Sequence, residues 1–178
     1  YFSDRVGETN PDVLRPLAYL DGSLPMMIRS AKPTEDCVFS DPRSGGVLKL
    51  HNAAPWGSVM AGGIAVYNLT GEQQNFSFAP SDIPELEKSR RYWIYDWFGK
   101  QAYSMDAEER FEGTIDAQGF GWYVILPERE SLSCLGLTEK YVGFSAVESV
   151  SEVSGCTTVV LRETGTVSWL SHRKCRSV

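Results

Sequence analysis

The sequence is short of the features that several functional classes require. Its 178 residues hold 17 Lys and Arg against 23 Asp and Glu, which gives a net charge of −6. Nucleic-acid binding needs a basic face, so this acidic balance argues against a nucleic-acid partner. No apolar run approaches the roughly 20 residues of a membrane-spanning helix, which argues against a membrane partner.

Groups for metal and nucleophilic chemistry are also scarce. The histidines are His51 and His172, and neither lies in the context of a nucleophile elbow. Zinc needs three or four clustered His or Cys ligands, and the sequence has neither such a cluster nor a CxxC pair. The glycines of residues 61–63 lack the Lys of a phosphate loop and predict a hairpin or a close backbone approach instead. We therefore expect no metal and no cofactor.

The four cysteines leave the cellular compartment open. Cys37, Cys134, Cys156 and Cys175 could form three different pairings if all were bonded. Three of them lie in apolar or strand-like contexts, where a free Cys behaves as a small hydrophobe, so free thiols are favoured. Two triplets fit the glycosylation sequon, which matters only in a secreted eukaryotic protein. On balance the cytoplasm is favoured.

The first 45 residues predict a short helix followed by a long ordered loop. Pro11 suits a first helical turn, Thr9 or Asn10 could cap it, and apolar residues follow helical spacing as far as Leu20. Pro16 interrupts this pattern, so the helix is expected to be short or kinked. Prolines and glycines punctuate residues 22–46, which predicts the loop.

From residue 47 onward the sequence predicts about ten short strands. They are rich in β-branched and aromatic residues and are separated by turn signals, a pattern typical of an all-β sandwich or barrel. A single helical turn is expected within residues 80–86. The expected strands span residues 47–51, 63–68, 74–78, 92–97, 111–115, 121–126, 133–137, 142–146, 157–161 and 166–170. We therefore predict an all-β fold, an antiparallel β-sandwich, with a domain boundary between residues 1–45 and 46–178.

The five tryptophans raise a sugar-binding hypothesis, because exposed aromatic rings stack on sugars. Tryptophans on strands mostly fill cores, so we expect burial for Trp93, Trp97, Trp122 and Trp169. Trp56 differs because it lies in residues 51–57, which we interpret as a loop, and loops carry function more often. Its exposure is therefore left open at this point.

Several segments resemble one known family, in the same order along the chain. They are residues 2–8, 20–23, 32–42, 48–52, 63–68 and 79–86. The most specific is Lys32–Pro42, whose sequence Lys-Pro-Thr-Glu-Asp-Cys-Val-Phe-Ser-Asp-Pro is similar to a segment of the raffinose synthase and alkaline α-galactosidase family of plants and microbes. The resemblance is collinear over residues 1–90. The chain departs from the family pattern at His51, where the family has Trp, and at residues 53–56.

The resemblance implies a split architecture, in which a catalytic (β/α)8 barrel precedes an antiparallel β domain. Residues 1–45 would be the tail of the barrel, namely its last strand and helix with a linker, and residues 46–178 the C-terminal β domain. Ser3 and Asp4 would lie at the rim of the sugar site, since barrel active sites form at the C-terminal ends of the strands. Trp56 is a further candidate for substrate binding at this rim. The family's two catalytic aspartates lie on earlier segments, so this chain would carry no catalytic residue.

Two functional hypotheses follow. In the first, the chain is the non-catalytic C-terminal region of a retaining α-galactosidase-like glycoside hydrolase that acts on α-galactosides. Its partner would be the catalytic barrel of the same polypeptide, and it would expose an apolar patch without that barrel. The absence of a Met before Tyr1 favours this hypothesis. In the alternative, the chain is an autonomous carbohydrate-binding β-sandwich whose ligand contacts exposed aromatic rings, Trp56 among them.

Overall fold

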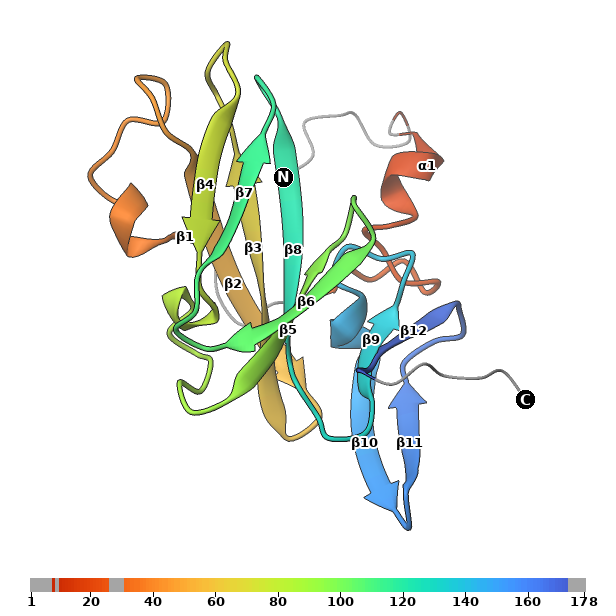
Figure 1. The fold of residues 1–178 in the computed structure, drawn as a ribbon. Helices are drawn as coiled ribbons and strands as arrows, with labels where there is room; N and C mark the ends of the chain where they lie inside the picture. Colours follow the sequence, from red (N-terminus) through yellow and green to blue (C-terminus); the bar gives the residue numbers. More distant parts are fainter. Residues whose placement is uncertain (1–7, 9, 26–30, 173–178) are drawn as a thin grey trace.

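A six-stranded antiparallel sheet forms the centre of the protein (Figure 1). The computed structural model describes residues 8, 10–25 and 31–172, and these confirm the all-β prediction. Within these ranges no helix is both long and apolar enough to span a membrane. The strands of the sheet, in spatial order, are β1 (Lys32–Pro33), β2 (Leu48–Trp56), β3 (Val59–Tyr67), β8 (Phe120–Pro127), β5 (Arg91–Asp96) and β6 (Gln101–Asp106).

One face of the sheet, here called the closed face, is covered by a two-stranded ribbon. In this ribbon β4 (Gln74–Phe78) pairs with β7 (Phe111–Ile115). Successive side chains of a strand point to opposite sides, so alternate residues of the ribbon reach the sheet. A single turn, η2 (Pro80–Asp82), follows β4, as the sequence predicts. The buried cluster between the layers includes Ile64, Phe76, Phe78, Ile83, Ile94, Tyr123 and Ile125.

The opposite face, here called the open face, is covered mainly by the last part of the chain. There β9 (Ser133–Leu137) pairs with β12 (Val167–Leu170), and the turn η3 (Gly143–Ala146) packs against β9. The hairpin of β10 (Val147–Val153) and β11 (Cys156–Leu161) projects at the lower right of Figure 1. The buried cluster on this side includes Trp56, Trp93, Trp122, Val124, Leu126, Cys134 and Phe144.

The helix expected near the N-terminus is a single turn, α1 (Pro11–Leu14), capped by the side chain of Asn10. It ends before Pro16, because a proline inside a helix removes a backbone hydrogen bond and clashes with the preceding turn. A second short turn, η1 (Glu35–Cys37), follows β1. The origin of residues 1–45 in a barrel, and the boundary at residue 46, stay predictions.

The segment expected to be a loop at residues 51–57 belongs to β2, which pairs in register with β3 up to Trp56 and Val59. Pro55 is accommodated because it lies beyond the two residues that pair with β1, so its missing N–H costs no ladder hydrogen bond on that free edge. Gly57 has a φ of 62°, which the tight turn into β3 requires. The loop prediction was therefore wrong.

The strand expected at residues 142–146 is absent, and residues 143–146 form η3 instead. The chain turns there so close to β9 that a Cβ on Gly143 would lie 2.0 Å from the carbonyl oxygen of Leu137. The strands β6 and β10 were missed in the sequence, because their mixed polar composition hides their pairing. Cys37, Cys134 and Cys156 are free thiols, as expected, while Cys175 lies outside the described residues.

Candidate functional site

A pocket of about 460 Å³ opens on the open face of the sheet. Its walls are largely apolar and come from β2, β3 and β8, from the segment after β9, and from the turn after α1. None of its described lining residues is a carboxylate, so it offers no acid–base pair of the kind that glycoside hydrolysis needs. The lining residues are Leu17, Ala31, Leu50, His51, Asn52, Ala65, Tyr67, Phe120, Trp122, Tyr141 and Val142.

The floor of this pocket depends on a glycine beneath a tryptophan. A Cβ on Gly63 would lie 2.1 Å from Cη2 of Trp122, so only glycine lets the indole lie flat on β3. The glycine run of residues 61–63 thus marks a close approach, as the sequence predicted. The indole Nε1 of Trp122 donates a hydrogen bond to the carbonyl oxygen of Tyr141 at 2.6 Å. This bond fixes the segment after β9 at the pocket wall.

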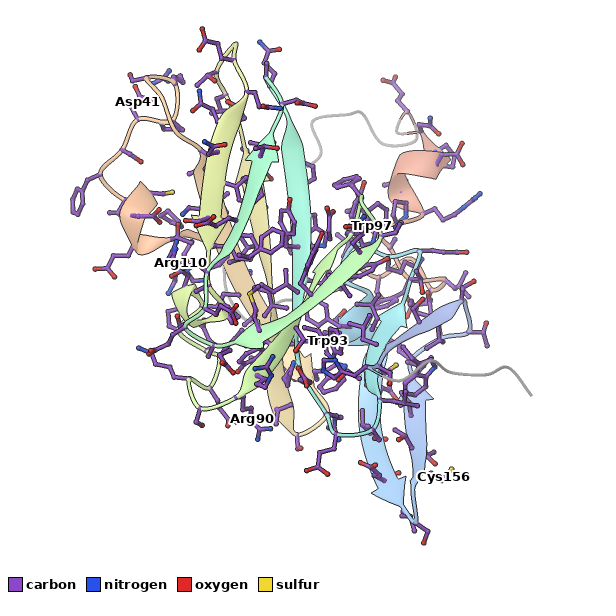
Figure 2. All side chains as sticks on the ribbon, viewed as in Figure 1. Asp41, Arg90, Trp93, Trp97, Arg110 and Cys156 are labelled. Carbon is purple, nitrogen blue, oxygen red and sulfur yellow. The ribbon has the colours of Figure 1, made fainter. Side chains whose placement is uncertain are left out.

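A group of aromatic rings continues from the pocket to the surface, here called the aromatic rim: Tyr67, Trp97, Phe98, Phe120 and Tyr141. The rings are in successive contact, with centroid separations of 4.9 Å for Tyr67 and Phe120, 5.6 Å for Phe98 and Phe120, and 4.4 Å for Trp97 and Tyr141. Phe98 is 47% and Phe120 44% exposed. Figure 2 shows Trp97 near the turn that contains α1. The rim is therefore an apolar surface beside an apolar pocket.

A polar network holds the N-terminal segment against this wall. The ammonium group of Lys140 donates to the carbonyl oxygens of Arg15 and Ala18, the former at 2.8 Å, and lies 3.5 Å from the carboxylate of Glu163. Lys140 and Glu163 are each about nine-tenths buried. The Tyr19 hydroxyl shares a hydrogen bond of 2.6 Å with Ser145, and burial raises the pKa of Tyr19. These contacts join chain segments more than 120 residues apart.

Two titratable side chains among the described lining residues have a displaced pKa. Burial raises the pKa of Tyr67. Burial lowers the pKa of His51, with Lys32 acting in the same direction and Glu85 and Asp82 opposing it. The His51 Nδ1 atom is buried and has no hydrogen-bond partner. A neutral imidazole in this position is a packed side chain rather than a base aimed at a substrate. Among the described residues no three His, Cys, Asp or Glu side chains group closely enough to hold a metal ion.

None of the residues singled out as site candidates in the sequence is among the described lining residues of this pocket. Ser3 and Asp4 fall outside the described residues. Trp56 is fully buried; its Nε1 donates to the carbonyl oxygen of Cys134 at 3.0 Å and the Arg129 guanidinium lies over its ring at 4.8 Å. The sequence left the exposure of Trp56 undecided, and the structure shows that it is buried. Trp56 is therefore not among the exposed rings that the second hypothesis requires.

The other four tryptophans divide between core and surface. Trp93 and Trp122 are buried as predicted, Trp97 is half-buried, and Trp169 is 38% exposed, so its predicted burial was wrong. The aromatic rim was missed because Tyr67 and Phe120 are the end residues of their strands, where alternation no longer indicates which ring is covered.

Residues 1–76 match the family model described as "Raffinose synthase or seed imbibition protein Sip1". The galactinol–sucrose galactosyltransferase of Oryza sativa subsp. japonica is 42% identical over 169 residues, covering 83% of this chain and 21% of the rice protein. Over these residues the chain is similar to the raffinose synthases. The stachyose synthase of Pisum sativum is 27% identical over 144 residues, covering 80% of the chain and 14% of that protein. The chain therefore spans about a fifth or less of the length of these curated proteins.

Two solved structures resemble parts of this chain. The α-galactosidase I of Mortierella vinacea is 11% identical with a TM-score of 0.39, and covers 53% of this chain and 22% of its own. The α-galactosidase of Saccharomyces cerevisiae, solved with raffinose, is 12% identical with a TM-score of 0.39, and covers 60% of this chain and 33% of its own.

Proposed function

We propose that this chain is the non-catalytic C-terminal β-sandwich region of an α-galactosidase-like enzyme. The enzyme would act on α-galactosides, by hydrolysis or by galactosyl transfer, and the β region would pack against a catalytic barrel of the same polypeptide. The observation that carries this proposal is the 42% identity to a galactosyltransferase of which the chain covers only 21%. The chain is assigned no catalytic residue.

The pocket on the open face supports the packing part of this proposal. Exposed apolar patches beyond a few hundred Å² are uncommon on proteins that work alone, and often mark an interface. Here an apolar pocket adjoins five aromatic rings, and Leu17 at its edge belongs to the N-terminal segment, which a preceding domain would have to approach. We place the contact with the barrel at this pocket.

The first test compares the natural gene product with this chain. We expect intact mass spectrometry to give a natural product larger by at least about 250 residues, the size of a (β/α)8 barrel. That product should release galactose from, or transfer galactose between, α-galactosides, whereas the 178-residue chain should do neither. A natural product of about 19.8 kDa, or turnover by the chain alone, would refute the proposal.

Chemical labelling of tyrosine tests where the barrel packs. Tyr67 and Tyr141 line the pocket and should be iodinated in the 178-residue chain but protected in the larger natural product. Tyr103, which is 38% exposed on β6, serves as the control and should react in both. Equal labelling of Tyr67 and Tyr141 in the two proteins would mean that the pocket is not the contact.

The second candidate function, an autonomous carbohydrate-binding β-sandwich, is favoured by one observation. Phe98 and Phe120 are large exposed rings in contact with each other, as a sugar platform requires, although Trp56 is not among them. A natural product of the same size as this chain would support this candidate over the first.

A further inference from the structure

A second, smaller pocket of about 210 Å³ lies where β5 and β8 meet the end of β7. It is more polar than the pocket on the open face and is lined by two carboxylates, two exposed aromatic rings and a tyrosine. Phe120 lines both pockets and separates them. The two pockets are therefore neighbours that share one wall.

Tyr123 places an unpartnered hydroxyl group in this pocket. The side chain is 7% exposed, and its ring is packed in the closed-face core against Phe76, Phe78 and Phe111. The hydroxyl lies beside Gly121, where an added Cβ would be 3.4 Å from it, and both residues line the pocket. No described residue forms a hydrogen bond with this hydroxyl. Because no described residue uses this hydroxyl, a polar ligand atom in the pocket can form a hydrogen bond with it.

The protonation state of Tyr123 makes it a hydrogen-bond donor. Burial, followed by the nearby negative charge of Asp96, raises the pKa of Tyr123 to about 12. The hydroxyl therefore keeps its proton at neutral pH and can both donate and accept a hydrogen bond. A group of this kind matches an alcohol, which also donates and accepts.

The two carboxylates are held in fixed positions by other donors. Asp96 Oδ1 accepts backbone hydrogen bonds from Phe98 at 3.0 Å and Gly99 at 2.9 Å, which orders the turn that carries the Phe98 ring. Asp116 Oδ1 accepts from the side-chain amide of Gln73 at 3.0 Å. In both residues Oδ2 has no hydrogen-bond donor among the described residues. Each carboxylate can therefore accept a hydrogen bond from a ligand hydroxyl.

The aromatic side of the pocket adds an apolar surface. The rings of Phe98 and Phe120 are 5.6 Å apart with an interplanar angle of 78°, and almost half of each is exposed. No Lys or Arg is among the described lining residues, and Lys100 lies over the Trp97 ring at 3.7 Å. Two carboxylates disfavour an anionic ligand, and a wholly apolar ligand would leave the Tyr123 hydroxyl unpaired. A pyranose has both required surfaces, namely an apolar C–H face and a ring of hydroxyl groups.

We propose that the pocket formed by Asp96, Phe98, Asp116, Phe120 and Tyr123 binds one neutral sugar residue. The C–H face of the sugar lies against the two phenylalanine rings, and its hydroxyls bond to the two carboxylates and to Tyr123. This inference develops the second candidate function. Its site shares Phe120 with the pocket at which we place the barrel contact, so binding is tested on the 178-residue chain without a barrel. The site forms and breaks no covalent bond; its role is to bind the sugar.

The test is a titration of the ¹⁵N-labelled 178-residue chain with raffinose and with methyl α-galactoside, followed by two-dimensional NMR. We expect shifts in the amides of Gly99, Gly119 and Gly121 at millimolar sugar. Tyr123→Phe removes only the hydroxyl and should weaken binding about 3- to 10-fold, the effect of losing one hydrogen bond. Tyr95→Phe is the matched control, since Tyr95 is also 7% exposed on β5 but lies on the open face.

Two further variants test whether the Phe98 ring contributes to sugar binding, as distinct from any general effect of removing a phenylalanine. Phe98→Ala should also weaken binding, whereas Phe39→Ala, at a ring 98% exposed and not part of the pocket, should not. The absence of sugar-induced shifts at these glycines would overturn the proposal, as would equal affinities for Tyr123→Phe and Tyr95→Phe. Shifts caused by tetramethylammonium but by neither sugar would also overturn it, because the pocket would then be a cation site.

Discussion

The two faces of the six-stranded sheet are covered in different ways. On the closed face the cover is β4 and β7, which come from the middle of the chain. Their phenylalanine rings pack onto isoleucines of β3, β5 and β8, strands that lie near them in the sequence. On the open face the cover comes from residues 133–170 and from the segment after α1, and it is joined by polar contacts between distant residues. The closed face has a core of packed aromatic and aliphatic side chains, while the open face keeps an apolar pocket.

This difference indicates where stability and function are concentrated. Three aromatic residues of the ribbon, Phe76, Phe78 and Phe111, contact one another and Tyr123, and none of the three lines the pocket at the end of β7. The open face instead has its rings at the rim of the pocket of about 460 Å³. Substitutions on the closed face should therefore act mainly on folding, and those at the open rim mainly on binding or packing.

The largest effect is expected for Phe78→Ala on the closed face. Phe78 is fully buried, and its removal leaves a cavity in a packed core, so the free energy of unfolding should fall by about 3–5 kcal/mol. Phe98→Ala at the open rim should cost less than about 1 kcal/mol, because nearly half of that ring is already exposed. Urea unfolding measures both. Equal losses would show that the two faces do not differ in this way.

Lys140→Met should have the next largest effect and should act on the N-terminal segment. It removes the donor to two backbone carbonyls and leaves the buried Glu163 carboxylate without its cation, which should cost about 3 kcal/mol. Chymotrypsin should then cut after Tyr19, the residue next to Ala18, sooner than in the unchanged chain. Glu163→Gln keeps the Lys140 hydrogen bonds and should release the segment less. Unchanged cleavage after Tyr19 in Lys140→Met would contradict the anchoring role.

Gly62 and Gly63 are neighbours on β3 and face opposite sides of the sheet, so Gly63→Ala and Gly62→Ala compare the open and the closed face. The added Cβ at residue 63 meets three atoms of the rigid Trp122 ring, whereas at residue 62 it meets chiefly the flexible end of Ile83. Gly63→Ala should lower the unfolding free energy by about 1–3 kcal/mol and alter the tryptophan fluorescence. Gly62→Ala should cost less and leave the fluorescence unchanged. The reverse order would mean that the indole adapts more easily than the isoleucine.

The smallest effect concerns pH and His51. Burial lowers the His51 pKa below its ordinary value of 6.5, so the unfolded chain binds the proton more readily than the folded protein does. The contribution of His51 to stability is therefore complete above about pH 6.5 and is lost as the pH falls from there through the lowered pKa. The unfolding free energy should decrease less steeply below pH 6.5 in His51→Gln than in the unchanged chain. Parallel pH profiles for the two proteins would rule out this contribution.

Much of the strand content could be predicted from local pattern. The expected strands at residues 74–78, 111–115 and 133–137 match β4, β7 and β9 residue for residue, because each lies between clear turn signals. The predicted strand at residues 47–51 was shorter than β2, because Pro55 suggests a break. The proline is acceptable only because β1 does not pair with this part of β2. η3 was taken for a strand because its apolar composition does not reveal the tight turn against β9.

The candidate sites were much less predictable than the strands. Trp56 was a site candidate because the sequence placed it in a loop, yet it is the most deeply buried of the five tryptophans. Its indole donates a hydrogen bond to the carbonyl oxygen of Cys134, a residue 78 positions away that local sequence cannot reveal as a neighbour. Phe98, Phe120 and Tyr123 gave no signal in the sequence. Their pocket exists only because three strands, β5, β7 and β8, have ends that lie close together.

The sequence by itself determined the all-β class, most of the strands, the early end of the N-terminal helix and the relation to the raffinose synthases. These depend on local backbone preferences, on side-chain alternation and on motifs read along the chain. Only the tertiary structure decided which aromatic rings are buried, which face of the sheet is closed and where pockets lie. The physical reason is that alternation gives every strand two faces, while the cover on each face depends on contacts with residues far away in the chain.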